Sequence, residues 1–289
     1  MEPSGSDRTG PDRSVRDRAR LVRTAPIMGT VASIHVLGDA GGGPVDEREV
    51  QPAIDACFQE LADLERIFSP FRADSDISRI RAGVLAPADA DCRVAVVRGE
   101  CEEAKRLTHG LFDAWHQGWF DPTGYVKGWA TETAARHRLE PLLEMDGVDA
   151  VGIGVGGDVQ LFTAQGSDWR WHVGIADPAA PGSVAATIEV RTGAVATSGI
   201  AERGSHIIDP RTGSPATTVA SATVVADGLA TADLWATTAV IAGFDDLSWT
   251  GAEGVRSGIL ISPSGEIRRW AGSIELARWQ DPALTRPSR

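Results

Sequence analysis

Residues 121–130 read Asp-Pro-Thr-Gly-Tyr-Val-Lys-Gly-Trp-Ala, and this segment separates a helix-rich part of the chain from a strand-rich part. Before it, apolar residues recur every three or four positions over residues 47–67 and 93–108, which predicts two amphipathic helices. A third helix is expected to begin near Val126 or Lys127, inside the segment itself, and to run to about residue 138.

Strand patterns dominate the chain after this segment. Short apolar runs bounded by turn residues predict strands over 150–155, 169–175, 186–190, 194–197 and 220–226, and a hairpin over 258–267. A short strand over 32–37 precedes the helices, and a fourth helix is expected over 228–242. Because helices and strands are mixed without strict alternation, the pattern favours an α+β fold over a doubly wound parallel sheet.

Length and charge limit the classes of protein that fit. The 289 residues suit one large domain or two intimately packed ones, and an apolar content of 42% can build a sizeable core. The net charge of −12 argues against a nucleic-acid-binding protein. An acidic protein that binds a polyanionic ligand needs a local positive site or a metal ion.

The termini and the cysteines indicate the compartment. The three cysteines form no CxxC pair, which argues against a disulfide scaffold and a zinc site. The first 23 residues hold six arginines and no apolar run, and no segment approaches the roughly 20 apolar residues of a membrane span. We expect a cytoplasmic protein with a disordered tail over 1–23, a single domain over 24–279 and a C-terminal tail over 280–289.

Lys127 stands out because the chain has only two lysines among its 28 basic residues. Arginine-rich usage suggests a GC-rich coding bias, so a lysine between an acid, two glycines and an aromatic residue indicates a need for a compact ammonium. Such a point charge pairs with phosphate, where arginine offers a planar fork. The alternative is a helix start that happens to carry a lysine.

Asp233 and Thr237 are four residues apart and share one face of the predicted fourth helix. A carboxylate and a hydroxyl side by side suit a hard cation such as Mg²⁺, which takes its other ligands from phosphate and water. The alternative is an aspartate near a helix N-terminus and a threonine that bonds back to its own helix.

His206 is the histidine that lies in a dense polar motif, His-Ile-Ile-Asp-Pro-Arg-Thr-Gly over residues 206–213. An imidazole with an ordinary pKa of about 6.5 would suit a general base. The alternative is a turn, because Asp209-Pro210 followed by Thr212-Gly213 is a turn signal in itself. Gly152, Gly154 and Gly157 lack the spacing and the following helix of a dinucleotide-binding fingerprint.

Seven motifs occur in a fixed order. They are Met28-Gly29-Thr30, Phe68–Arg72 with Asp76–Arg79, Phe112-Asp113, the 121–130 segment, Gly156-Gly157-Asp158, the histidine motif extended to Pro215, and Ala232-Asp233 with Ala236-Thr237. This succession resembles the ApbE-type FAD:protein FMN transferases from about residue 25 to 245. The resemblance implies an α+β, tunnelling-fold-like (ApbE-like) arrangement of mixed sheets with packed helices, in which two similar halves form one unit.

The resemblance also implies an activity and a set of partners. Members cleave the pyrophosphate of FAD in the presence of Mg²⁺, link FMN through a phosphoester to a threonine or serine of a target flavoprotein, and release AMP. The target carries a D-G-x-[ST]-G-A-T-like acceptor segment. The residues are compatible with two alternative functions. The chain could be an Mg²⁺-dependent FAD pyrophosphatase that gives free FMN and AMP, or a non-catalytic FAD-binding protein.

The resemblance implies roles for twelve residues: eight nucleotide contacts, three metal ligands and one catalytic base. Met28 and Phe71 would line the flavin or adenine pocket. The nucleotide would also be contacted by Leu111, Phe112, Asp113, Asp121, Lys127 and Ile207. Mg²⁺ would be held by the Gly124 carbonyl and the side chains of Asp233 and Thr237, and His206 would be the catalytic base. The chain departs from the common pattern at Phe71, often tyrosine, and at Arg81 and Gly154, often asparagine.

Overall fold

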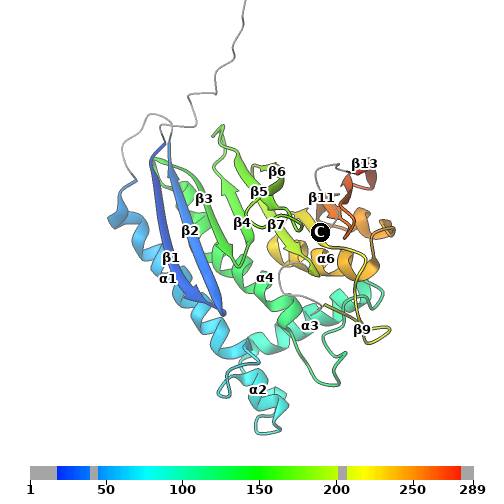
Figure 1. Cartoon of the computed structure of the whole chain (residues 1–289). Helices are drawn as coiled ribbons and strands as arrows, with labels where there is room; N and C mark the ends of the chain where they lie inside the picture. The colour runs from blue at the N-terminus through cyan, green and yellow to red at the C-terminus, as the bar shows by residue number, and fades with distance from the viewer. Residues whose placement is uncertain (1–17, 40–44, 201–206, 281–289) are drawn as a thin grey trace, which may run out of the picture.

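A nine-stranded antiparallel sheet forms the centre of the molecule (Figure 1). The computed structural model describes residues 18–39, 45–200 and 207–280. Within them the strand order is β1-β2-β3-β4-β7-β10-β11-β12-β13. The strands of this sheet are β1 (Arg20–Ile27), β2 (Thr30–Gly38), β3 (Val148–Val155), β4 (Asp158–Thr163), β7 (Gly193–Ser198), β10 (Ser221–Ala226), β11 (Val255–Ile261), β12 (Glu266–Ala271) and β13 (Ile274–Gln280).

Helices cover one face of the sheet and a β-hairpin covers part of the other (Figure 1). The helices are α1 (Glu47–Phe68), α2 (Asp76–Arg81), α3 (Cys92–Leu107), α4 (Thr123–Ala134) and α6 (Leu229–Ala242), with short helical turns at Pro87–Asp89, Ala135–Leu139, Glu140–Glu144 and Ser248–Gly251. The hairpin consists of β5 (Trp171–Ala176) and β6 (Val184–Val190), and a separate small ladder joins β8 (Ile208–Asp209) to β9 (Ser214–Pro215). The predicted α+β class, with mixed sheets and packed helices, is confirmed.

The alternation of side chains along each strand divides the core between the two faces. On the helix face, Ile34 and Val151 pack with α1 and α4, while Val224 and Leu260 pack with α6. On the opposite face, Leu161, Val195 and Val225 pack against Trp171 and Ile175 of the hairpin. The helix α6 is buried nearly all round, which explains why apolar residues occur on all of its sides.

The antiparallel register gathers distant segments at each end of the sheet. One end, which we call the Met28 end, holds the β1–β2 turn at Met28, the β3–β4 turn at Gly156, the last residue of β7, Ser198, and the first residue of β10, Ser221. The opposite end we call the Arg18 end, because Arg18 precedes β1 there. Consequently the motifs Met28-Gly29-Thr30 and Gly156-Gly157-Asp158 lie side by side at the Met28 end.

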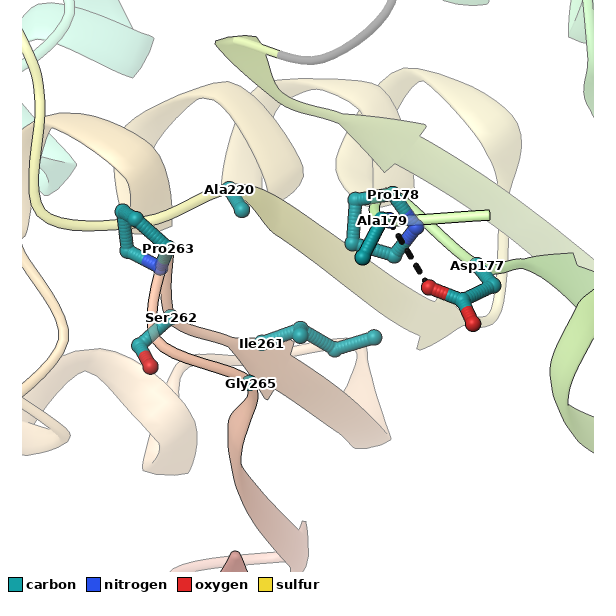
Figure 2. Close-up of a pocket in the computed structure, with 8 residues that line it drawn as sticks. All are labelled: Asp177, Pro178, Ala179, Ala220, Ile261, Ser262, Pro263 and Gly265. Atoms are coloured by element: carbon teal, nitrogen blue, oxygen red, sulfur yellow. Dashed lines mark hydrogen bonds between the residues drawn. The ribbon is translucent and has the colours of Figure 1, made fainter. Parts of the chain in front are cut away.

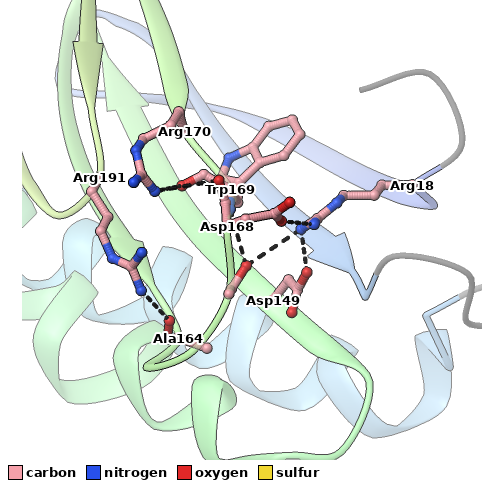
Figure 3. Close-up of polar contacts among 8 residues, drawn as sticks. Arg18, Asp149, Ala164, Asp168, Trp169, Arg170 and Arg191 are labelled. Atoms are coloured by element: carbon pink, nitrogen blue, oxygen red, sulfur yellow. Dashed lines mark hydrogen bonds and ion pairs between the residues drawn. The ribbon is translucent and has the colours of Figure 1, made fainter. Parts of the chain in front are cut away.

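At the Arg18 end an ion cluster joins three segments (Figure 3). The guanidinium of Arg18 pairs with the carboxylates of Asp149, in β3, and Asp168, beyond β4, and it lies 5.4 Å from the ring centroid of Trp169. Its Nη1 is also 3.4 Å from Ser167 Oγ. This cluster fastens the segment before β1 to the rest of the sheet.

Several elements differ from the sequence prediction. Strand β1 was not predicted, and its first half, residues 20–23, falls in the stretch assigned to the N-terminal tail. The strand lies at an edge of the sheet with most of its residues exposed or half-buried, so it carries no apolar run. Helix α4 begins at Thr123, earlier than predicted, because the Asp121 carboxylate accepts the Thr123 N–H at 3.1 Å. No helix within the described ranges is long and apolar enough to cross a membrane.

Candidate functional site

Gly128 lets helices α4 and α6 approach closely. A Cβ at this position would lie 2.8 Å from the Leu229 carbonyl oxygen and 2.9 Å from Cβ of Asp233. Only a glycine therefore fits at this crossing, and its neighbour Lys127 is carried to the side of Asp233. The other glycine of this motif, Gly124, has a different role. It packs on Phe112, and a Cβ at this position would lie 3.2 Å from the ring.

The start of α6 is held by side chains from two other elements. No side chain of its own caps the helix at Gly228. Instead, the Leu229 N–H donates to Gln160 Oε1 in β4 at 2.9 Å, and the Ala230 N–H donates to Glu132 Oε2 in α4 at 3.0 Å. Both acceptors satisfy free N–H groups of the first turn. This fixes the position of Asp233, one turn further along, relative to β4 and α4.

Lys127 lies between two buried carboxylates. Its Nζ pairs with the carboxylate of Asp158, at the start of β4, and is 3.5 Å from Asp233 Oδ2. The side chains of Asp158 and Asp233 are 3% and 6% exposed, and that of Lys127 is 29% exposed. The second oxygen of Asp158 accepts the Thr197 N–H of β7 at 2.9 Å. We call these three charged residues the Lys127 cluster.

The Lys127 cluster carries one more negative than positive charge. Burial raises the pKa of Asp233, Lys127 lowers it and Asp158 raises it, with a net value of about 6. Burial lowers the pKa of Lys127, but Asp233 and Asp158 outweigh it and hold that pKa above its usual value. The pKa values of Lys127 and Asp233 can both be raised, because Lys127 has two carboxylate partners whereas Asp233 shares its one ammonium with Asp158. The lysine therefore stays charged, and the cluster favours a further cation.

Thr237 lies one turn beyond Asp233 on α6. Its Oγ1 is 3.0 Å from Oγ of Ser198, the last residue of β7. Asp233 is the fifth residue of α6, past the first turn, so it is not an aspartate that caps the helix. The shared face of Asp233 and Thr237 is thus turned toward the Met28 end of the sheet, where β7 ends.

The residues predicted to contact the nucleotide come from several segments of the chain. The Met28 N–H donates to Glu65 Oε2 at the end of α1 at 3.0 Å, and the Met28 side chain packs against the core. Leu111 and Ile207 pack against the core around α6. The ring of Phe112 is 6.3 Å from that of Tyr125, centroid to centroid.

Two of the predicted contact residues have roles in local structure. The Asp113 carboxylate is 2.8 Å from Lys105 Nζ and accepts the Trp115 N–H, which fastens the loop after α3. Asp121 begins α4. Phe71 is 93% exposed, so the structure does not bring its ring against the other predicted residues. His206 lies outside the described residues.

Sequence reasoning assigned no role to Asp158 and Ser198. The signal for Asp158 was present, because a charged residue directly after Gly156-Gly157 opens a strand that is otherwise buried. Ser198 offered no signal, since a serine that ends a strand is ordinary.

Arg81, the position at which the resemblance leads one to expect an asparagine, places its guanidinium 4.1 Å from the ring centroid of Trp119.

A separate pocket opens on the hairpin face of the sheet (Figure 2). It has a volume of about 190 Å³ and is formed by residues 177–179 after β5, Ala220 before β10, and residues 261–265 around the β11–β12 turn. The carboxylate of Asp177 accepts the Ala179 N–H at 2.8 Å and so stabilises its own turn. The pocket brings none of the sequence-predicted site residues together, in contrast to the Lys127 cluster.

The fold and the cluster define a class of protein with a buried acidic site, one lysine and a helix hydroxyl at one end of an antiparallel sheet. The model of the ApbE family matches residues 28–121 and 116–256. The chain belongs to the ApbE family.

Curated relatives carry one name. An FAD:protein FMN transferase of Rhodobacter capsulatus is 37% identical over 206 residues, which cover 68% of this chain and 35% of the relative. An FAD:protein FMN transferase of Vibrio cholerae is 25% identical over 279 residues, covering 76% of this chain and 80% of the relative. The chain thus spans about a third of the first relative and most of the second.

Solved structures share the fold. The flavin transferase ApbE from Vibrio cholerae superposes with a TM-score of 0.66 at 21% identity, over 89% of this chain and 98% of that one. The ApbE protein of Thermotoga maritima gives a TM-score of 0.69 at 21% identity, over 86% and 96%. At these identities the likeness shows the fold alone, and the site is argued from this chain's own residues.

Proposed function

We propose that this protein is an FAD:protein FMN transferase, which moves FMN from FAD to a threonine or serine hydroxyl of a target flavoprotein and releases AMP. The observation that carries the proposal is the buried Lys127 cluster, with the Thr237 hydroxyl one turn from Asp233. Family membership and the name of the curated relatives support the same activity. As a partner we propose a flavoprotein with a D-G-x-[ST]-G-A-T-like acceptor segment.

The chemistry of the donor set fits Mg²⁺. Asp233 and Thr237 offer a carboxylate and a hydroxyl, which are hard oxygen ligands, and Gly124 would add its carbonyl. Among the described residues no group of three or more His, Cys, Asp or Glu side chains converges on one point. A cation here would take its remaining ligands from phosphate and water, as Mg²⁺ does. When bound, it would neutralise negative charge on the pyrophosphate oxygens.

The chain's own residues would handle charge, orientation and one proton. Lys127 would place its ammonium beside the pyrophosphate, where charge neutralisation lowers the barrier. The acceptor oxygen forms a bond to the FMN phosphorus, the bond from that phosphorus to the bridging oxygen breaks, and AMP leaves. His206, outside the described residues, would take the proton of the acceptor hydroxyl, a role that its motif supports.

We place the reaction in the cytoplasm. The support is the state of the cysteines: Cys57, Cys92 and Cys101 are all free, and two of them are buried in the core. Free thiols are typical of reducing compartments.

One incubation tests the proposed activity against its alternatives. The full chain is mixed with FAD, Mg²⁺ and a peptide that carries the acceptor segment. We expect AMP together with flavinylated peptide. AMP with free FMN would identify a pyrophosphatase, and bound intact FAD would identify a binding protein. A His206→Ala variant is expected to bind FAD but to transfer FMN roughly a hundred- to ten-thousand-fold more slowly.

A further inference from the structure

Asp158 contacts Lys127 more closely than Asp233 does, and its own position is fixed. Its side chain is 3% exposed, and the residue opens β4 and is tied to the neighbouring strand β7 through the Thr197 N–H. Lys127 reaches it from α4 on a flexible four-carbon stem. The ammonium pairs with Asp158 and stays 3.5 Å from Asp233 Oδ2. Asp158 is therefore the closer of the two anchors for this ammonium.

The place of the ammonium matters because a cation and Lys127 would compete for Asp233. Two positive groups cannot both pair closely with one carboxylate oxygen without strong repulsion in a buried site. An ammonium centred on Asp233 would neutralise that side chain and occupy the position of a metal ion. An ammonium held to one side leaves Asp233 with an available oxygen.

We propose that Asp158 is a positioning residue, which holds the Lys127 ammonium away from Asp233 and so keeps Asp233 available to a divalent cation. The inference rests on the proposed metal role of Asp233. It goes beyond that role because it assigns a purpose to a buried carboxylate that is neither a proposed metal ligand nor a proposed nucleotide contact. Without Asp158 the flexible lysine would move the short distance to Asp233.

An asparagine at position 158 separates the charge of the residue from its structural contact. The amide oxygen can still accept the Thr197 N–H, whereas the charged partner of Lys127 is lost. The loss of the negative charge also weakens the binding of any nearby cation through space, whether or not Lys127 moves. A double-mutant cycle with Lys127→Met separates these two effects, because the direct effect of the charge is present with and without the lysine.

The experiment measures Mg²⁺ affinity by calorimetry on the full chain without FAD, for the wild type, Asp158→Asn, Lys127→Met and the double variant. With Lys127 present, Asp158→Asn is expected to weaken Mg²⁺ binding by about tenfold or more. With methionine at 127, the same change is expected to weaken it by less than about threefold. Glu60→Gln, which removes a mostly buried carboxylate paired with Arg138 at 2.7 Å, is the matched control and is expected to leave Mg²⁺ affinity unchanged.

The outcomes separate this inference from the proposed function. Equal fold-changes in the two backgrounds would overturn the positioning role of Asp158. If Asp233→Asn binds Mg²⁺ as tightly as the wild type does, the metal role of Asp233 fails and the inference falls with it. If Asp233→Asn abolishes binding while the cycle is additive, only the inference is wrong. Should Asp158→Asn fail to fold, Asp158→Ser keeps a hydroxyl for the Thr197 N–H and replaces it in the cycle.

Discussion

Two basic side chains in this protein each lie between two aspartates, at opposite ends of the same sheet. Arg18 pairs with Asp149 and Asp168 at the Arg18 end, and Lys127 pairs with Asp158 and Asp233 at the Met28 end. Their surroundings differ. Arg18 is 5% exposed but Asp168 is 78% exposed, so water solvates one acid of that group. Both acids of the Lys127 cluster are buried.

This difference separates a structural ion cluster from a candidate functional site. The planar guanidinium of Arg18 has several donors, and carboxylates, a hydroxyl and an aromatic ring surround it (Figure 3). Nothing further is needed there, because solvent screens the remaining charge of Asp168. In the Lys127 cluster both acids are at most 6% exposed, so solvent screens the excess negative charge less, and a divalent cation is the simplest complement.

The largest expected effect belongs to Asp233. An Asp233→Asn substitution is expected to slow FMN transfer by about three orders of magnitude, or about 4 kcal/mol, because it removes the charged metal ligand. Thermal unfolding of the apo protein should change little, since the isosteric amide also relieves repulsion with Asp158. Mg²⁺ should raise the Tm of the wild type and leave that of the variant unchanged. Transfer at a near wild-type rate by the folded variant would contradict the assignment.

The next effect belongs to Lys127, whose ammonium is proposed to meet the pyrophosphate. Lys127→Met is expected to weaken FAD binding by about tenfold to a hundredfold, through loss of a charge-assisted contact. Lys127→Arg should recover the loss only in part, because a planar fork does not fit between two carboxylates spaced for an ammonium. Titration of flavin fluorescence with each variant measures this, and an unchanged affinity in Lys127→Met would remove the lysine from the FAD site.

The two clusters also show which residues could be predicted from the sequence alone and which could not. Helix α1 was predicted nearly to its bounds because its buried residues, such as Ile54 and Leu61, repeat at the helical period. Lys127, Asp233 and Thr237 were singled out because their motifs are local. The sequence did not predict that Asp158 pairs with Lys127 or that Asp149 pairs with Arg18. These partners are 31 and 131 residues apart, and their meeting depends on the register of the strands.

Strand β1 shows the same limit in the fold. Its residues alternate between exposed and half-buried positions at the edge of the sheet, so local composition resembles that of a charged tail. Its register against β2, from Arg20 opposite Leu37 to Ile27 opposite Thr30, comes from a turn with Met28 at a φ of 53° and Gly29 at 69°. A methionine in the left-handed region is rare and gives no turn signal in a sequence.

An effect on stability instead of activity is expected at Arg18. Arg18→Met keeps the length of the side chain and leaves Asp149, which is 17% exposed, without its cation. Removal of one partner of a buried pair should lower the free energy of unfolding by about 3 kcal/mol. Mg²⁺ affinity and the rate of FMN transfer should stay at wild-type values where the variant is folded. Chemical denaturation with a parallel transfer assay measures both, and a loss of Mg²⁺ affinity would show that the two ends of the sheet are coupled.

The smallest effect is expected at Asp168, which is the exposed counterpart of Asp158. Each of these aspartates pairs with a cation that also contacts another aspartate, but the side chain of Asp168 is 78% exposed and that of Asp158 is 3% exposed. An exposed carboxylate gains little from its partner because water and salt screen the pair, so Asp168→Asn should change the free energy of unfolding by less than about 1 kcal/mol. Arg18 would keep Asp149, Ser167 and the ring of Trp169 as partners. Denaturant titrations at low and high salt measure the difference, which should vanish at high salt. A salt-independent loss of several kcal/mol would mean that the Arg18 cluster is as tightly coupled as the Lys127 cluster, and the distinction drawn from burial would fail.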